Sequence, residues 1–234
     1  MTIAAITFLA IFTQSVSGFG LGLVAISLLA NVMGIRAASP LVSLIGITAQ
    51  FTILLYYRRD FNLRAVARLA ATAILGIPIG LYFLRQVDSG IVTAVLGLVL
   101  ISYSLYTLIG FKMPRLDHPL WAYSLGFVSG MLGGAYNTSG PPVIIYGACQ
   151  EWPRAEFKSN LQGYFLLVSS TSAVGHALSG NITSTVWHNY LFALPAIALG
   201  IIIGVSLDKR INPHYFRQLV LIMLIILGLR LIVA

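Results

Sequence analysis

Long apolar segments recur along the whole chain, with only short polar connections between them. They cover residues 3–33, 39–57, 64–84, 90–110, 119–149, 159–179, 187–206 and 213–234. Apolar stretches of about 18 or more residues are typical of transmembrane helices. Charged residues make up only 9% of the chain, and no polar stretch is long enough to form a soluble domain. The sequence therefore predicts one all-α polytopic membrane domain over residues 1–234.

Two of these segments, 3–33 and 119–149, exceed the roughly 20 residues that a straight span needs. Each is interrupted near its middle by glycine and polar residues, QSVSGFGLG at 14–22 and GGAYNTSGPP at 133–142. An unpaired backbone group in hydrocarbon is costly, so such a break persists only where protein or a wet cavity surrounds it. A pair of breaks at matching positions points to a substrate site between two structural repeats.

The chain accordingly divides into two halves of four segments, about 1–111 and about 119–234. Internal similarity supports this division, because LGIPIG at 75–80 recurs as LGIIIG at 199–204. The paired glycines in these motifs, Gly76/Gly80 and Gly200/Gly204, indicate close helix packing. That packing could lie within the bundle or at the interface of a homodimer.

The loop charges test how segment 119–149 crosses the membrane. A single crossing divides the Lys and Arg residues seven to seven, whereas a hairpin that enters and leaves on one side places eleven of the 14 in the cytoplasm. The positive-inside rule favours the hairpin. By symmetry, 3–33 is expected to form a second hairpin from the opposite face. The predicted fold is therefore two inverted repeats, each a broken re-entrant helical hairpin plus three transmembrane helices, with both termini outside.

The second limb of each hairpin is expected to begin near the centre of the membrane, after Ser17 and Gly18 in one and at SGPP (139–142) in the other. Helix N-termini carry several free N–H donors and a partial positive charge, which together favour an anion. Glycines would allow close backbone approach, and hydroxyl and amide groups would supply hydrogen bonds. The candidate substrate-binding residues are Ser15, Ser17, Gly18, Gly20, Gly133, Gly134, Asn137, Thr138, Ser139 and Gly140.

Polar residues elsewhere in the apolar segments are further candidates. Gln50, Lys158, Asn160 and Gln162 could line a substrate pathway, or they could supply interhelical hydrogen bonds. Lys158 could also extend toward the membrane surface or contribute to the loop charge bias. His176 could relay protons, although interfacial placement is favoured. Because no Asp or Glu falls deep in a segment, a carboxylate proton relay is disfavoured.

The two broken segments, SVSGFGLG at 15–22 and GMLGGAYNTSGPP at 130–142, resemble those of the TauE/SafE sulfite exporter family. The resemblance covers essentially the whole chain, although 137–141 is more polar than the Gly-rich pattern of the family. The signature positions fall on Gly18, Gly20, Gly133, Gly134 and Pro142. The resemblance implies transport of sulfite, organosulfonates or related organic anions across a bacterial inner membrane.

The leading hypothesis is thus a secondary carrier for a small anion, working by alternating access without a cofactor or metal. A nucleotide-binding loop is not recognisable, so direct ATP coupling is disfavoured. One alternative is a passive anion channel, and another is a membrane-embedded hydrolase or transferase that uses Ser139 with a histidine base. The enzyme alternative lacks a G-x-S-x-G or H-E-x-x-H motif. Although the net charge is +8, the basic residues lie between apolar segments, so the expected partners are the lipid bilayer and an anion, not nucleic acid.

Overall fold

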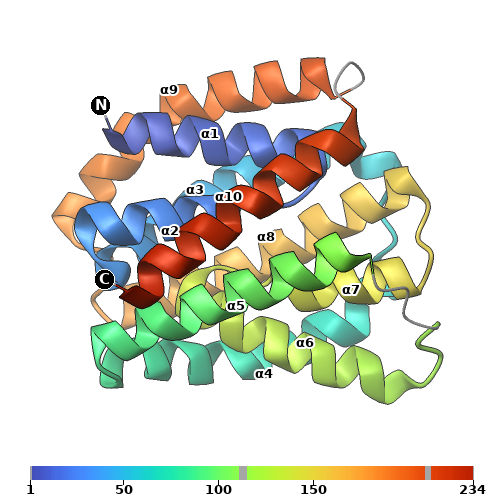
Figure 1. Ribbon diagram of the computed structural model, residues 1–234, viewed down its shortest axis with the longest axis horizontal. Helices are drawn as coiled ribbons and strands as arrows, with labels where there is room; N and C mark the ends of the chain where they lie inside the picture. Colours follow the sequence, from blue (N-terminus) through green and yellow to red (C-terminus); the bar gives the residue numbers. More distant parts are fainter. Residues whose placement is uncertain (1, 111–114, 209–211, 234) are drawn as a thin grey trace.

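The computed structural model describes residues 2–110, 115–208 and 212–233 and confirms an all-α architecture (Figure 1). The helices are α1 Thr2–Ser17, α2 Leu21–Met33, α3 Ile35–Tyr57, the 3₁₀ turn η1 Arg58–Asp60, α4 Leu63–Gln86, α5 Ser89–Ile109, α6 Pro119–Tyr136, α7 Gly140–Cys149, α8 Arg154–Leu178, α9 Ser184–Leu207 and α10 Pro213–Val233. Among the described residues, α3 together with η1, α4, α5 and α9 are long and apolar enough to cross a membrane.

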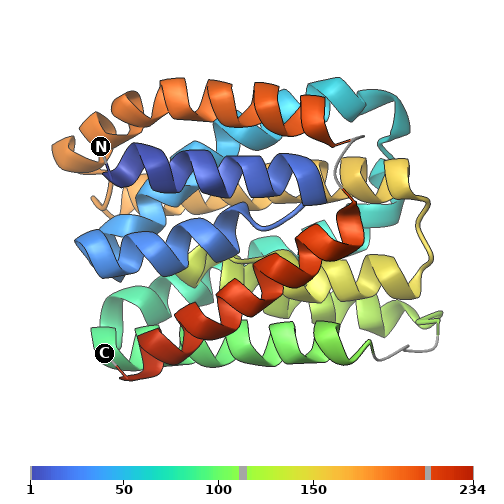
Figure 2. The ribbon, with the colours of Figure 1, turned by 45° about the horizontal axis from the view of Figure 1, so that its top comes forward.

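Each of the two long apolar segments forms a helical hairpin. The α6–α7 hairpin begins and ends at the same end of the bundle, because Gln150 Nε2 donates a hydrogen bond of 2.7 Å to the Leu116 carbonyl oxygen. The α1–α2 hairpin begins and ends at the opposite end, near both chain termini (Figures 1 and 2). The tips of the two hairpins therefore point toward each other in the middle of the molecule.

The helices of the first half pack mainly against helices of the second half. α3 packs on α8 and α5 packs on α10, while α4 packs on α6 and α9 packs on α1. If each helix of α1–α5 is matched in order with a helix of α6–α10, the α4–α6 contact corresponds to the α9–α1 contact. The α3–α8 and α5–α10 contacts each join a helix to its own counterpart. The contacts of α4 with α8 and of α9 with α3 follow the same scheme.

Glycines allow the closest of these helix contacts. A Cβ added to Gly76 or Gly80 of α4 would lie 2.3 or 2.1 Å from a carbonyl oxygen of α6. On α9, a Cβ added to Gly200 or Gly204 would lie 2.8 or 2.5 Å from a side-chain atom of α1. Both glycine pairs therefore serve packing within the bundle, the first of the two alternatives drawn from the sequence.

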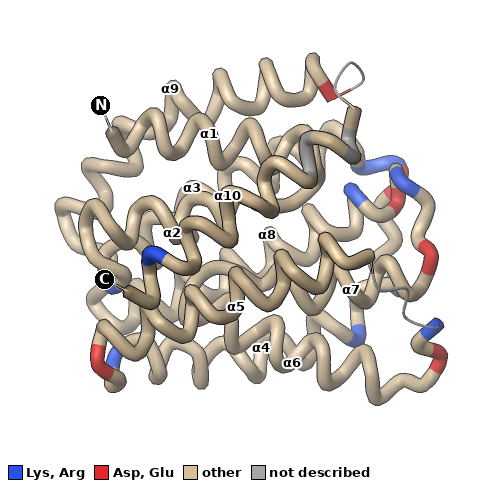
Figure 3. The backbone as a smooth tube through the Cα atoms, in the orientation of Figure 1, with Lys and Arg blue, Asp and Glu red and all other residues tan. Residues whose placement is uncertain are grey.

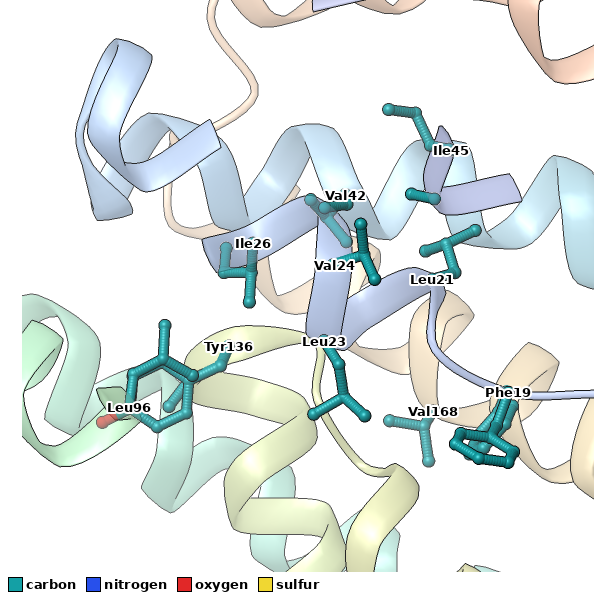
Figure 4. Packing of buried hydrophobic residues seen from close by; sticks show 14 of the residues in the cluster. Phe19, Leu21, Leu23, Val24, Ile26, Val42, Ile45, Leu96, Tyr136 and Val168 are labelled. Atoms are coloured by element: carbon teal, nitrogen blue, oxygen red, sulfur yellow. The ribbon is translucent and has the colours of Figure 1, made fainter. Parts of the chain in front are cut away.

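Apolar side chains fill the interior around the first break and also cover much of the outside. Side chains of α2, α3 and α8 surround the start of α2, as Leu23, Val42 and Val168 illustrate (Figure 4). Large apolar side chains are exposed on α5, α9 and α10, among them Leu98 and Ile202. An extended apolar exterior of this kind is the surface expected of a protein that contacts lipid.

Charged residues gather at the two ends of the helices (Figure 3). Hydrogen bonds join Asn62 to Glu156 and Arg154 to Asp208, so the connections that carry them share one end, called here the charged end. The α5–α6 connection reaches the same end through the bond of Leu116 to Gln150. The described Lys and Arg residues in these connections and in the adjoining helix turns are Arg58, Arg59, Arg64, Arg68, Arg115, Arg154 and Lys158. Arg36 donates to the Arg85 carbonyl oxygen at the other end. This grouping agrees with the hairpin arrangement, while Lys112, Lys209 and Arg210 lie outside the described residues.

Candidate functional site

The two breaks are in direct backbone contact at the centre of the bundle. A Cβ added to Gly22 at the start of α2 would lie 2.0 Å from the Asn137 carbonyl oxygen in the second break. Gly20, which precedes α2, has a φ of 111°, and Asn137, which follows α6, has a φ of 52°. Left-handed backbone of this kind ends or redirects a helix, and it is why both segments turn here.

A small polar cavity lies where the tips meet, with a volume of about 20 Å³. It is lined by Gln14, Gly20, Gly22, Leu23, Gln50, Asn137, Thr138, Ser139, Gly140 and Phe165. A cavity needs about 10–15 Å³ to hold one water molecule, so this volume admits about one water molecule and not a larger ligand. The arrangement is therefore a closed site, in which the tips must separate before a larger molecule can enter.

Unpaired hydrogen-bond donors face this site from both helices. The described part of the chain offers no acceptor to the amide N–H groups of Gly22 and Leu23 at the start of α2 or to that of Gly140 at the start of α7. The first turn of α7 presents fewer donors than the several expected, because Pro141 and Pro142 have no N–H. The predicted helix N-termini thus converge, but α2 contributes more of the backbone donors.

Two side chains at the site also lack partners. Ser139 lies at the N-cap position of α7 yet makes no capping hydrogen bond, and its side chain is buried. Gln50, from α3, is 5% exposed, and its Oε1 atom has no hydrogen-bond partner among the described residues. Buried polar groups are normally paired. The Ser139 hydroxyl is therefore available as a donor to water or a ligand, whereas Gln50 Oε1 can only accept a hydrogen bond.

A pair of glutamines holds the first break in shape. Gln14 Oε1 accepts a hydrogen bond from the Leu21 amide at 3.0 Å, while Gln14 Nε2 donates to Gln162 Oε1 at 2.9 Å. Gln162 Nε2 in turn donates to the Gly18 carbonyl oxygen at 2.8 Å. Gln162 therefore supports the break and does not line the cavity. Gln14 was not singled out from the sequence, although a glutamine just before a glycine-rich break was the available signal.

Asn137 and Thr138 line the cavity, but their side chains bond to the protein. Asn137 Nδ2 donates to the Ser39 carbonyl oxygen at 3.1 Å, and Asn137 Oδ1 accepts from Ser169 at 3.4 Å. Thr138 Oγ1 donates to the Tyr136 carbonyl oxygen at 3.2 Å. The Asn137 amide therefore attaches the second break to α3 and α8.

Several predicted binding residues lie away from the cavity. Ser15 Oγ bonds to the Ile11 carbonyl oxygen and faces Gly204 of α9. Ser17 Oγ bonds to the Thr13 carbonyl oxygen within α1 and accepts from the Phe19 amide, so it stabilises the turn.

The predicted glycines outside the cavity serve close packing. Gly133 packs against Val168 and Gly134 against Ile77, at distances that leave no room for a Cβ. Gly18 has a φ of 85° and lies against Lys158.

The remaining pathway candidates also serve other contacts. Asn160 Oδ1 accepts from the Asn62 amide at 2.8 Å and thereby holds the connection before α4. Lys158 is buried beside the end of α1, so it does not extend to the membrane surface. His176, in the last turn of α8, is fully buried in the protein, and its Nε2 atom lies 3.2 Å from Ser39 Oγ.

Comparison with known proteins is consistent with this membrane architecture. The family model described as "Sulfite exporter TauE/SafE" matches residues 3–231. A protein of Cupriavidus necator, named a probable sulfite/organosulfonate exporter TauE, is 24% identical over 93% of this chain and 87% of its own length. A probable inner membrane transporter protein TsaS of Comamonas testosteroni is 26% identical over 74% of this chain and 73% of its own length. No solved structure gives a significant match. Since the family model spans nearly all the described helices and both breaks, the chain belongs to the TauE/SafE sulfite exporter family.

Proposed function

We propose that the protein is a secondary transporter that binds one small anion between the tips of the α1–α2 and α6–α7 hairpins. The observation that carries this proposal is the set of unpartnered donors around one closed cavity. They are the amides of Gly22, Leu23 and Gly140 and the Ser139 hydroxyl. None of the described lining residues is acidic, so the electrostatic environment favours an anion.

The substrate is a sulfite, organosulfonate or related oxyanion. The names of the two relatives and of the family support this class. An oxyanion with several acceptor oxygens also suits donors that reach it from different helices. The choice of a sulfur oxyanion over a carboxylate rests on the names of the family and its relatives.

Transport proceeds by alternating access about this site. The paired helix contacts and the hairpins from opposite ends support two inverted repeats, about 1–111 and 119–234, of the kind found in carriers. The charged end faces the cytoplasm, because it holds most of the described Lys and Arg residues, and both termini lie outside. The closed cavity corresponds to a state between the inward-open and outward-open forms.

The test is flux through purified protein in liposomes loaded with sulfite, taurine or lactate. A carrier is supported by saturable flux of one anion against its own concentration gradient, driven by exchange for another anion. A current that rises linearly with voltage indicates a passive anion channel instead. Selectivity for cations would contradict the anion site. An enzyme using Ser139 is not supported, since His176 is hydrogen-bonded to Ser39 and Asn181, not to Ser139.

A further inference from the structure

Lys158 forms a buried ion pair beside the first break. Its Nζ atom donates to Asp208 Oδ1 at 2.6 Å and to the Val16 carbonyl oxygen at 3.0 Å. The side chains of Lys158 and Asp208 are only 7% and 12% exposed. Arg154, which is largely exposed, contacts the same carboxylate oxygen at 3.3 Å, and the Tyr57 hydroxyl donates to the other oxygen at 3.2 Å. The pair thus joins α8 to the end of α1 and to the end of α9.

This ion pair lies between the charged end and the cavity. Lys158, Gln162 and Phe165 follow one another along one face of α8 at helical spacing. Phe165 lines the cavity, and Gln162 hydrogen-bonds Gln14, which lines it as well. The aliphatic part of Lys158 also packs over Gly18 in the break. An anion that moves from the charged end to the cavity along this face of α8 must pass the Lys158 ammonium.

The opposite end carries a matching contact without the charge. Ser39 Oγ donates to the Ala135 carbonyl oxygen at 3.2 Å, just as Lys158 Nζ donates to the Val16 carbonyl oxygen. The same interval of 119 residues separates Ser39 from Lys158 and Val16 from Ala135. Each contact therefore ties the tip of one hairpin to α3 or α8, on opposite sides of the cavity. Ser39 carries no charge itself and has the His176 ring at 3.2 Å, whereas the contact toward the charged end is made by the Lys158 ammonium.

We infer that Lys158 is an anion-exchange gate at the charged end of the proposed pathway. In the closed form its ammonium binds Asp208 and the Val16 carbonyl oxygen. On opening, it leaves Asp208 and binds the incoming sulfite or sulfonate, while Arg154 keeps the Asp208 carboxylate paired. Lys158 is thus the first residue that binds substrate from the cytoplasm. This gating role rests on the transport function proposed above.

The burial of the Lys158 ammonium explains why this gate stays closed until an anion arrives. An ammonium taken out of water without a partner is strongly unfavourable, so the gate opens rarely when no anion is present. A substrate anion replaces the carboxylate with an equivalent charge-assisted hydrogen bond and removes this penalty. Opening is thereby coupled to substrate, which limits leakage. Because Ser39 carries no charge, the coupling acts at one end only.

The test compares sulfite flux from each side of liposomes that hold the protein in known orientation. In Lys158→Met/Asp208→Asn, both charges are removed together, so no buried charge is left unpaired and the fold should persist. We expect its KM for sulfite supplied at the charged end to rise at least about tenfold, the loss of one charge-assisted contact. The KM for sulfite supplied at the other end should change less than about threefold.

Arg154→Gln is the matched control, since it removes an exposed cation from the same helix end. Its KM should stay within about threefold of wild type on both sides. A folded double variant with a wild-type KM at the charged end would overturn the gate. Equal KM increases on both sides would also overturn it. If the wild-type protein itself moves no anion, the transport function fails, and the gate fails with it.

Discussion

At the scale of single residues, the site separates groups that bind the protein from groups that remain unpaired. Asn137 and Gln162 are polar and buried, but their amides support the two breaks. Ser139 and Gln50 are equally buried, yet the Ser139 hydroxyl makes no capping hydrogen bond, and Gln50 Oε1 has no hydrogen-bond partner among the described residues. Residue type alone does not distinguish the two groups, because each side chain can serve either role. The distinction identifies which substitutions should affect binding and which should affect folding.

Ser139→Ala should weaken anion transport without lowering stability. A lost hydrogen bond to a charged ligand costs about 1.5–3 kcal/mol, which corresponds to roughly a tenfold to hundredfold rise in Kd. Ser139→Asp should be worse, because its charge repels the anion. Asn137→Ala, in contrast, should lower the thermal unfolding temperature, since it removes the bonds to Ser39 and Ser169. Sulfite binding and thermal unfolding of the purified variants check these outcomes, and wild-type affinity in Ser139→Asp would refute the site.

At the scale of helices, the two hairpins are held by unequal contacts. α6 lies against α4 so closely that glycines on both helices face backbone atoms, including Gly130 opposite the Ala73 carbonyl oxygen. α1 lies against α9 with the side chains of Ile11 and Ser15 between the backbones. Interhelical packing of small residues is a main source of stability in membranes. The α4–α6 contact should therefore tolerate added side-chain volume less well than the α1–α9 contact.

Alanine substitution of one glycine from each interface tests this difference. In Gly80→Ala the new Cβ meets the Met131 carbonyl oxygen at 2.1 Å, and only backbone movement relieves the clash. In Gly204→Ala the nearest atom is Ser15 Cβ at 2.5 Å, so a second change to Ser15→Gly removes it. We expect both single variants to unfold at lower temperature in detergent. Ser15→Gly should restore much of the loss in Gly204→Ala, and failure to restore it would contradict the proposed packing.

At the scale of the whole molecule, the distribution of charge defines two different ends. Loops far apart in sequence meet at the charged end, where the Ser159 hydroxyl reaches the Tyr57 carbonyl oxygen and Asn62 reaches Glu156. Arg36 and Arg85 lie at the other end. An unequal division of basic residues orients membrane proteins during insertion. Orientation is therefore a property that labelling of the intact protein can measure.

Cysteine labelling in a Cys149→Ser background should place the charged end in the cytoplasm. Ala155→Cys and Ser89→Cys are suitable because both positions are exposed and lie at opposite ends. A membrane-impermeant thiol reagent added to intact cells should modify position 89 and leave position 155 unmodified until the cells are opened. Modification of position 155 in intact cells would overturn the orientation and the re-entrant arrangement of the α6–α7 hairpin.

Much of the architecture was predictable because the bilayer imposes strong rules on sequence. Segment lengths, the two breaks and the loop charges indicated an all-α membrane protein with paired hairpins, and the all-α fold and the family are confirmed. The inverted repeats, the orientation and the site residues stay predictions. The Gly76/Gly80 and Gly200/Gly204 pairs were recognised as contacts, but their partners were not identified.

By itself, then, the sequence determined the kind of molecule, because hydrophobic length and loop charge act locally and can be read residue by residue. Only the tertiary structure decided which polar groups remain unpaired at the cavity. That outcome depends on long-range partners, such as Gln162 for Gln14 and Ser39 for Asn137, which no spacing in the chain specifies. The tertiary structure likewise placed Lys158 against Asp208. A buried charge needs an opposite charge nearby, and the packing of the helices decides which residue supplies it.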